Sequence, residues 1–125
     1  MSIETEIFDA AKSLFPSTDG QPRFYGGSFP LDPKIPKTPA ARFVFISSEQ
    51  VEDICGTDGG RTANSRVQVD IVHTSYLACR NLRQAVIDAI EAMPTPARLD
   101  GGFDDFDHET KLHRCSIDFV IYPSS

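Results

Sequence analysis

The side chains best suited to chemistry lie in one acidic stretch, Asp100–Glu109. This stretch holds five carboxylates and no lysine or arginine, and carboxylate oxygens are common ligands of calcium. A calcium-binding loop needs about six to eight oxygens, usually in the order Asp-x-Asp-x-Asp-Gly with a closing Glu, and that order is absent. We therefore expect no metal site. We expect instead a solvated acidic tip, formed by Asp104, Asp105 and Asp107.

Other motifs that could support catalysis are also missing from the sequence. The three histidines, His73, His108 and His113, stand outside any H-x-x-x-H or H-E-x-x-H spacing, and no G-x-S-x-G occurs. The three Gly-Gly pairs lack the spacing of a phosphate-binding loop, so they are interpreted as turns. The sequence thus predicts neither an enzyme nor a cofactor site.

Cysteine usage, length and charge are typical of one small domain. Cys55, Cys79 and Cys115 are an odd number at wide spacings, which argues against a disulfide framework and a cysteine zinc site and favours reduced, mostly buried thiols in a cytoplasmic product. The 125 residues fit a single domain over 1–125, and the net charge of −6 excludes a broad basic surface for nucleic acid. Neither a membrane-spanning run nor a secretory signal is expected.

Two helices are expected from apolar residues at helical spacing. Residues 2–15 place apolar side chains three or four positions apart and stop before Pro16. Residues 75–93 show the same spacing behind Thr74 or Ser75, either of which can cap the start of the helix. Both patterns predict an amphipathic helix that packs one face on a core.

Alternating apolar residues predict five strands, over residues 23–25, 42–54, 64–73, 97–106 and 111–122. The strand over 64–73 points Val67, Val69 and Ile71 to one side, so that one face meets a core and the other meets water or a partner. The strand over 42–54 has apolar residues on both faces, which predicts cover on both sides, at least at its start. The polar residues 107–110 join the last two strands as a hairpin.

This order of elements predicts an α+β fold. We expect a single domain with an antiparallel or mixed sheet of about four to five strands and two helices packed on one face. Residues 28–41 form a proline-rich extended segment, with a proline at every third position from 30 to 39. That is the polyproline II period, so we expect a surface connector or, alternatively, a PxxP ligand for an SH3-like partner. Residues 55–63 form a flexible glycine-rich loop.

Two stretches of the chain resemble the tail completion and tail terminator proteins of long-tailed phages. Residues 65–86 place a VQVDI strand, a Ser-Tyr step and an amphipathic helix in the order found in that family. Residues 105–122 resemble its closing hairpin, an acidic turn that leads into an R-x-S-x-D-F strand. With the opening helix and Arg23-Phe-Tyr-Gly-Gly, the resemblance spans residues 3–122. The proline-rich segment and the loop over 56–63 depart from the family pattern.

The resemblance implies a structural protein of the virion tail, from a phage or a prophage, that is assembled in the cytoplasm of the bacterial host. Proteins of this family form a hexameric ring at the head-proximal end of the tail tube, which stops tube growth and provides the surface on which the head docks. The implied partners are further copies of the chain, the tail tube protein and a head completion or connector protein. DNA is implied only as passing cargo, and no cofactor or membrane is implied.

A closed ring requires one surface patch to meet a different patch on the next copy. The candidates for that interface are the polar face of the strand over 64–73 and one arginine of the preceding loop: Arg61, Arg66, Gln68 and Asp70. An acidic lumen would repel passing DNA, and Asp104, Asp105 and Asp107 are candidates for it. The alternatives are a head–tail connector or neck component, a non-viral regulatory module that binds a small ligand, and an enzyme.

Overall fold

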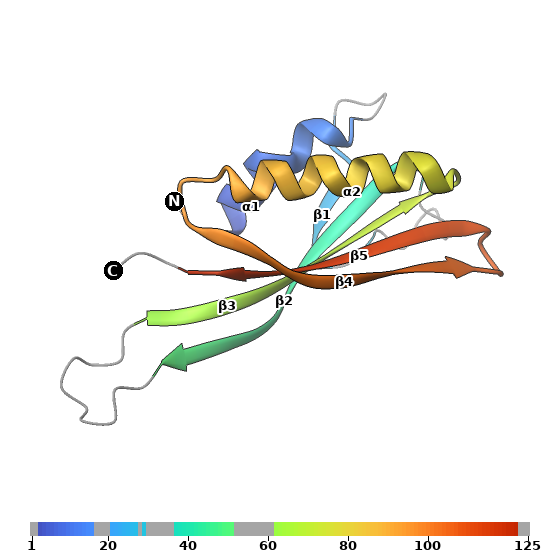
Figure 1. The fold of residues 1–125 in the computed structure, drawn as a ribbon. Coiled ribbons are helices and arrows are strands. Elements are labelled where there is room, and N and C mark those ends of the chain that lie inside the picture. The colour runs from blue at the N-terminus through green and yellow to red at the C-terminus, as the bar shows by residue number, and fades with distance from the viewer. Residues whose placement is uncertain (1–2, 17–20, 28, 30–36, 52–61, 123–125) are drawn as a thin grey trace.

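The computed structural model describes residues 3–16, 21–27, 29, 37–51 and 62–122, and it places both α-helices on one side of a single sheet (Figure 1). The elements in chain order are α1 (Ile3–Ala11), the 3-10 helix η1 (Lys12–Leu14), β1 (Phe24–Gly26), β2 (Ala40–Val51), β3 (Thr62–His73), α2 (Tyr76–Glu91), β4 (Ala97–Asp107) and β5 (Leu112–Ile121). The expected α+β class, with two helices on a sheet, is confirmed.

The sheet is mixed and has the strand order β1-β2-β3-β5-β4. β1 runs parallel to β2, and every other neighbouring pair is antiparallel. β3 lies at the centre because it pairs with β2 along its length and with β5 from Ser65 to His73. The register shifts at two places, between Phe45 and Ser47 and between Leu99 and Gly101. Strands β4 and β1 are therefore the edges of the sheet.

Local sequence signals account for both helices. Ser75 caps α2, because its hydroxyl accepts a hydrogen bond from the Ala78 N–H at 3.2 Å. α1 ends at Ala11 and continues as η1, so the single helix expected over 2–15 is shorter and tightens in its last turn. The carboxylate of Glu6 accepts hydrogen bonds from the Thr95 N–H at 2.8 Å and hydroxyl at 2.7 Å, which ties α1 to the turn after α2.

The core lies between the helices and the sheet. Val67, Val69 and Ile71 of β3 are fully buried against it, as their alternation predicts. At the β1 end, the ring of Phe24 stacks on Phe15 and Phe43 with centroid distances of 5.7 Å and 5.1 Å. These ring contacts fix the short strand β1 beside β2, although only three residues of each strand pair.

β2 matches the expectation of double cover only at its start. Ala40 is fully buried in a small apolar cluster with Val72 and Leu112, on the side away from the helices. Farther along the strand, Ile46 is 52% exposed at the position where the β2–β3 register shifts. Residues 28, 30–36 and 55–61 lie outside the described residues, so the proline-rich segment and the flexible loop stay predictions there. At their ends the structure differs, because residues 40–41 belong to β2 and residues 62–63 belong to β3.

Candidate assembly surface

A buried carboxylate occupies the centre of the helix-free face, the side of the sheet that carries Arg42, Asp70 and Ser116. The antiparallel register places these residues side by side, with Arg42 opposite Asp70 on β2 and Ser116 opposite Asp70 on β5. Asp70 is only 1% exposed, although neither α-helix covers this face. A buried charge is costly unless it is paired, so the neighbours of Asp70 must supply both cover and countercharge.

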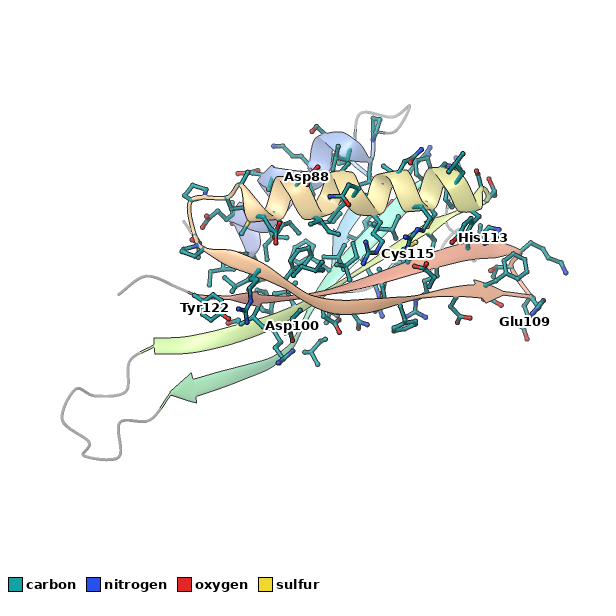
Figure 2. The ribbon with its side chains drawn as sticks, in the orientation of Figure 1. Asp88, Asp100, Glu109, His113, Cys115 and Tyr122 are labelled. Atoms are coloured by element: carbon teal, nitrogen blue, oxygen red, sulfur yellow. The ribbon has the colours of Figure 1, made fainter. Side chains whose placement is uncertain are left out.

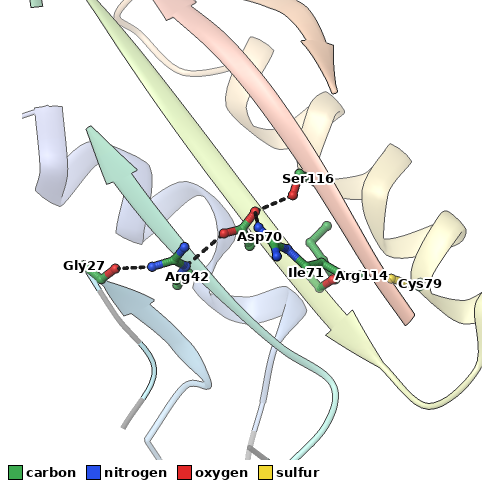
Figure 3. Close-up of polar contacts among 7 residues, drawn as sticks. All are labelled: Gly27, Arg42, Asp70, Ile71, Cys79, Arg114 and Ser116. Carbon is green, nitrogen blue, oxygen red and sulfur yellow. Dashed lines mark hydrogen bonds and ion pairs between the residues drawn. The ribbon is translucent and has the colours of Figure 1, made fainter. Parts of the chain in front are cut away.

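Two arginines supply that cover and countercharge (Figure 3). Asp70 Oδ2 accepts a hydrogen bond from Arg42 Nε at 2.9 Å, and Oδ1 accepts from Arg114 Nη2 at 3.4 Å and from the Ser116 hydroxyl. Arg42 Nη1 also donates to the Gly27 carbonyl at 3.1 Å. The arginine side chains are 30% and 38% exposed. Each arginine therefore keeps part of its hydration while it shields the carboxylate from water.

A further arginine, Arg66, lies on the same face of the sheet. Arg66 forms an ion pair with Asp100, which reaches across β5 from β3 to β4; Figure 2 shows Asp100 on the side of the sheet away from α2. The guanidinium of Arg114 lies 5.7 Å from the centroid of the Phe103 ring. These long side chains pack over the strands with their aliphatic stems. Charged side chains therefore cover the part of the helix-free face around Asp70 and Arg66.

The interface candidates from sequence differ in how accessible they are. Asp70 does not present its side chain to a partner, because Arg42, Arg114 and Ser116 already bind it. Arg66 and Gln68 lie on the same face and are half-buried, with Arg66 bound to Asp100. Arg61 lies outside the described residues.

The three acidic candidates on β4 are all exposed, yet they do not form one cluster. Asp104 binds Arg80 of α2 at 2.8 Å, whereas Asp105 lies opposite Arg114 and lines the helix-free side. Asp107 ends the strand, and its carboxylate accepts a hydrogen bond from the Glu109 N–H at 2.9 Å. This hydrogen bond lowers the pKa of the Asp107 carboxyl. Neighbouring residues of a strand point to opposite faces, so the acidic charge is divided between the two sides of the hairpin.

A cleft of about 600 Å³ opens at the hairpin end of the helix-free face. Charged residues of both signs line it, Arg42 and Arg114 on the sheet and Asp105 and Asp107 on the β4–β5 hairpin. Its apolar lining includes Phe29, Val72 and Leu112. Figure 2 shows Glu109 at the tip of this hairpin, beyond the end of α2. Because the cleft contains both positive and negative side chains, its charge does not favour either an anion or a cation as ligand.

His73, His113 and the two described cysteines take part in the packing of the fold. His73 Nδ1 accepts a hydrogen bond from the Ser75 N–H at 3.1 Å, and His113 packs between the rings of Tyr76 and Phe106. Burial raises the pKa of the Cys79 and Cys115 thiols, which lie between α2 and the sheet. Within the described ranges, no group of three or more His, Cys, Asp or Glu side chains could hold a metal ion.

Sequence reasoning missed Arg42 and Arg114 as the partners of Asp70. The two arginines stand 28 and 44 residues away from Asp70 in the chain. No local spacing signals such a contact, and only the strand order brings the three side chains together.

In the described part of the chain, no helix is long and apolar enough to cross a membrane.

Comparison with known proteins identifies the family of the chain. Residues 22–122 match the family model of the tail completion protein gp17, whereas no curated protein matches. A chain from a structure titled "Virion of native gene transfer agent (GTA) particle" shares the fold, with a TM-score of 0.53 at 10% sequence identity over 81% of this chain and 78% of that one. Since the family match spans every strand and α2, the chain belongs to the tail completion protein gp17 family and is a structural protein of the phage tail.

Proposed function

We propose that the protein forms a ring at the head-proximal end of the tail tube, where the ring stops tube growth and provides the docking surface for the head. The observation that carries this proposal is the family match over residues 22–122. Its partners are further copies of itself, the tail tube protein and a head completion protein. Assembly takes place in the cytoplasm of the bacterial host, and the role is mechanical rather than catalytic.

The shape of the chain supports assembly through unlike surfaces. The β2–β3 ribbon and the β4–β5 hairpin extend toward opposite ends of the sheet (Figure 1). A ring is closed by heterologous contacts, in which one end of a copy meets a different surface of the next copy. Two dissimilar ends on one rigid sheet supply such a pair of surfaces.

The surface residues nominated from sequence have separate parts in this proposal. Arg66 and Gln68 are the candidate contacts between copies, and the exposed Asp105 and Asp107 are candidates for the wall of the lumen. A lumen wall with excess negative charge would let DNA pass by repelling its phosphates. The net charge of −6 agrees with that role.

Deletion of the gene tests the proposed role, with the particles examined by electron microscopy and the native gene supplied in trans as the control. Tails of uncontrolled length, unattached to heads, are expected. Tails of normal length that fail to join heads would instead assign the protein to a head–tail connector. Infectious particles with normal tails would refute both structural roles.

The interface between copies is tested by a charge reversal that preserves the pair inside the chain. Arg66→Glu alone would repel Asp100, so it is combined with Asp100→Arg, which keeps an ion pair of opposite polarity. We expect this double variant to melt close to the native protein and to form fewer rings by native mass spectrometry. Unchanged ring assembly would remove Arg66 from the interface.

A further inference from the structure

Two register shifts of the sheet fall beside the same row of residues. On β2 the shift makes Ile46 an extra residue, directly after the partner of Val67. On β4 the shift makes Asp100 an extra residue, directly after the partner of Phe119. Val67 and Phe119 are themselves paired across β3 and β5. The two bulges therefore flank one row, one on each side of the central β3–β5 pair, and we call this row with its two bulges the crease.

The crease interrupts two of the three antiparallel ladders of the sheet. A β-bulge leaves its extra residue without a partner, bends the strand and increases the local twist. On β4 the irregular backbone continues into Gly101, whose φ of 131° is a conformation that glycine adopts readily. Only the β3–β5 ladder passes the crease in a constant register. The regular pairing that keeps a sheet in one shape is therefore reduced at this row.

The part of the sheet beyond the crease is narrow on the side of β2 and β3. β5 pairs with β3 only as far as Ser65, whereas the β2–β3 ladder continues to the pair of Val51 with Thr62. In Figure 1 this β2–β3 ribbon leaves the sheet at an angle to β5. β4 stays tied to α2 at the same level, since the Leu99 N–H donates to the Glu91 carboxylate at 3.2 Å. A change of angle at the crease would therefore move the ribbon rather than β4.

One ion pair connects the two sides of the crease on the helix-free face. Arg66 is the first residue of β3 beyond the crease, and Asp100 is the bulged residue of β4. The pair crosses β5, and two strand spacings amount to roughly 10 Å. The side chains of Arg66 and Asp100 are 42% and 31% exposed. Since an exposed ion pair contributes little free energy, this one can favour an angle of the ribbon without locking it.

We propose that the crease is a hinge of the β2–β3 ribbon and that the Arg66–Asp100 ion pair holds the ribbon at one angle. The hinge is a property of the single chain and does not depend on the proposed function. Its consequence for assembly does rest on that function. A ring closes only when one end of each copy meets the next copy in the correct direction, and the angle at the crease sets the direction of the ribbon.

The hinge is tested by double electron–electron resonance on the full-length protein, which measures the distribution of distances between two spin labels. One label is attached to Ala63→Cys on the ribbon and the other to Asn81→Cys on the exposed side of α2. Cys55→Ser removes a competing thiol, and the buried Cys79 and Cys115 stay unlabelled. Labelled protein is diluted with unlabelled protein, so that only distances within one chain are measured.

Asp100→Asn keeps the shape of the side chain and removes the charge that Arg66 binds. We expect the distribution between ribbon and α2 to become about 1.5 times wider or more. A second pair of labels, at Asn81→Cys and Glu109→Cys, reports on the β4–β5 hairpin and should keep its native distribution. An unchanged ribbon distribution overturns the proposal, and so does equal widening for both pairs of labels. Neither result bears on the proposed ring.

A matched ion pair away from the crease supplies the control. Arg80 and Asp104 are 43% and 32% exposed and connect α2 to β4, so Asp104→Asn removes a pair of nearly equal exposure. We expect this variant to keep the native ribbon distribution. The double variant Arg66→Glu and Asp100→Arg restores an ion pair across the crease and should return the ribbon to its native width. Equal widening by Asp104→Asn, or no recovery in the double variant, overturns the role of the ion pair.

Discussion

Replacement of Asp70 by asparagine tests whether the arginine cover of the helix-free face depends on a buried counterion. The substitution keeps the size of the side chain and removes the charge that Arg42 and Arg114 bind. Breaking a fully buried ion pair costs about 3–5 kcal/mol, and a single hydrogen bond to a charged group contributes about 1.5–3 kcal/mol. The arginine side chains are 30% and 38% exposed, so they recover hydration when the carboxylate is lost. We therefore expect a loss of about 2–3 kcal/mol in the free energy of unfolding.

The expected loss converts to a measurable shift in melting temperature. An unfolding entropy of about 2.1 cal/mol/K per residue, taken over 125 residues, gives about 4 °C per kcal/mol. Asp70→Asn should therefore melt about 8–12 °C below the native protein in a calorimetric scan. Asp100→Asn is the control, because its ion pair with Arg66 is exposed by 31% and 42% and should contribute less than about 1 kcal/mol. Equal shifts for both variants would refute the counterion role of Asp70.

Three further predictions concern single features of the fold. Ser75→Ala removes the cap of α2 and should lower the free energy of unfolding by about 1 kcal/mol in urea titrations; no change would mean that the cap is dispensable. Gly102→Ala places a Cβ 2.2 Å from the Ser116 carbonyl oxygen and should destabilise the fold more than Gly101→Ala. A Cβ at Gly101 meets open space, so that variant has only the strain of a positive φ, about 1–3 kcal/mol. The reverse order of melting temperatures would contradict the geometry. Burial raises the pKa of the Cys79 and Cys115 thiols, so both stay protonated at pH 8. In a Cys55→Ser variant, a thiol reagent should therefore modify them only after the protein unfolds. Modification of the folded protein would contradict their burial.

Elements whose partners are close in sequence could be predicted from residue patterns. The strand over 64–73 corresponds to β3 (Thr62–His73), and its core-facing residues Val67, Val69 and Ile71 are buried as predicted. The helix over 75–93 corresponds to α2, with Ser75 as its cap. The hairpin of the last two strands also forms, with β4 ending at Asp107 and β5 beginning at Leu112. In each case the signal is a short-range periodicity, a cap or a turn.

The candidate site could be predicted only in part, because its decisive contacts are long-range. Alternation along β3 places Asp70 on the side away from the core, and on that evidence the residue faces water or a partner. The structure instead buries it, because β2 and β5 flank β3 and each contributes an arginine. The position of β4 has the same long-range origin. β5 follows β4 in the chain yet lies inside it in the sheet, which leaves β4 as an edge strand.

The arginine cover of the helix-free face limits how another protein can bind there. The Asp70 cluster, in which Arg42 and Arg114 pair with the carboxylate, gives little reward to a partner that lies flat on it, because its charges are already paired. Such a partner would also have to remove water from the half-exposed guanidinium groups without offering better acceptors than Asp70. A partner of the helix-free face is therefore expected to bind away from the Asp70 cluster.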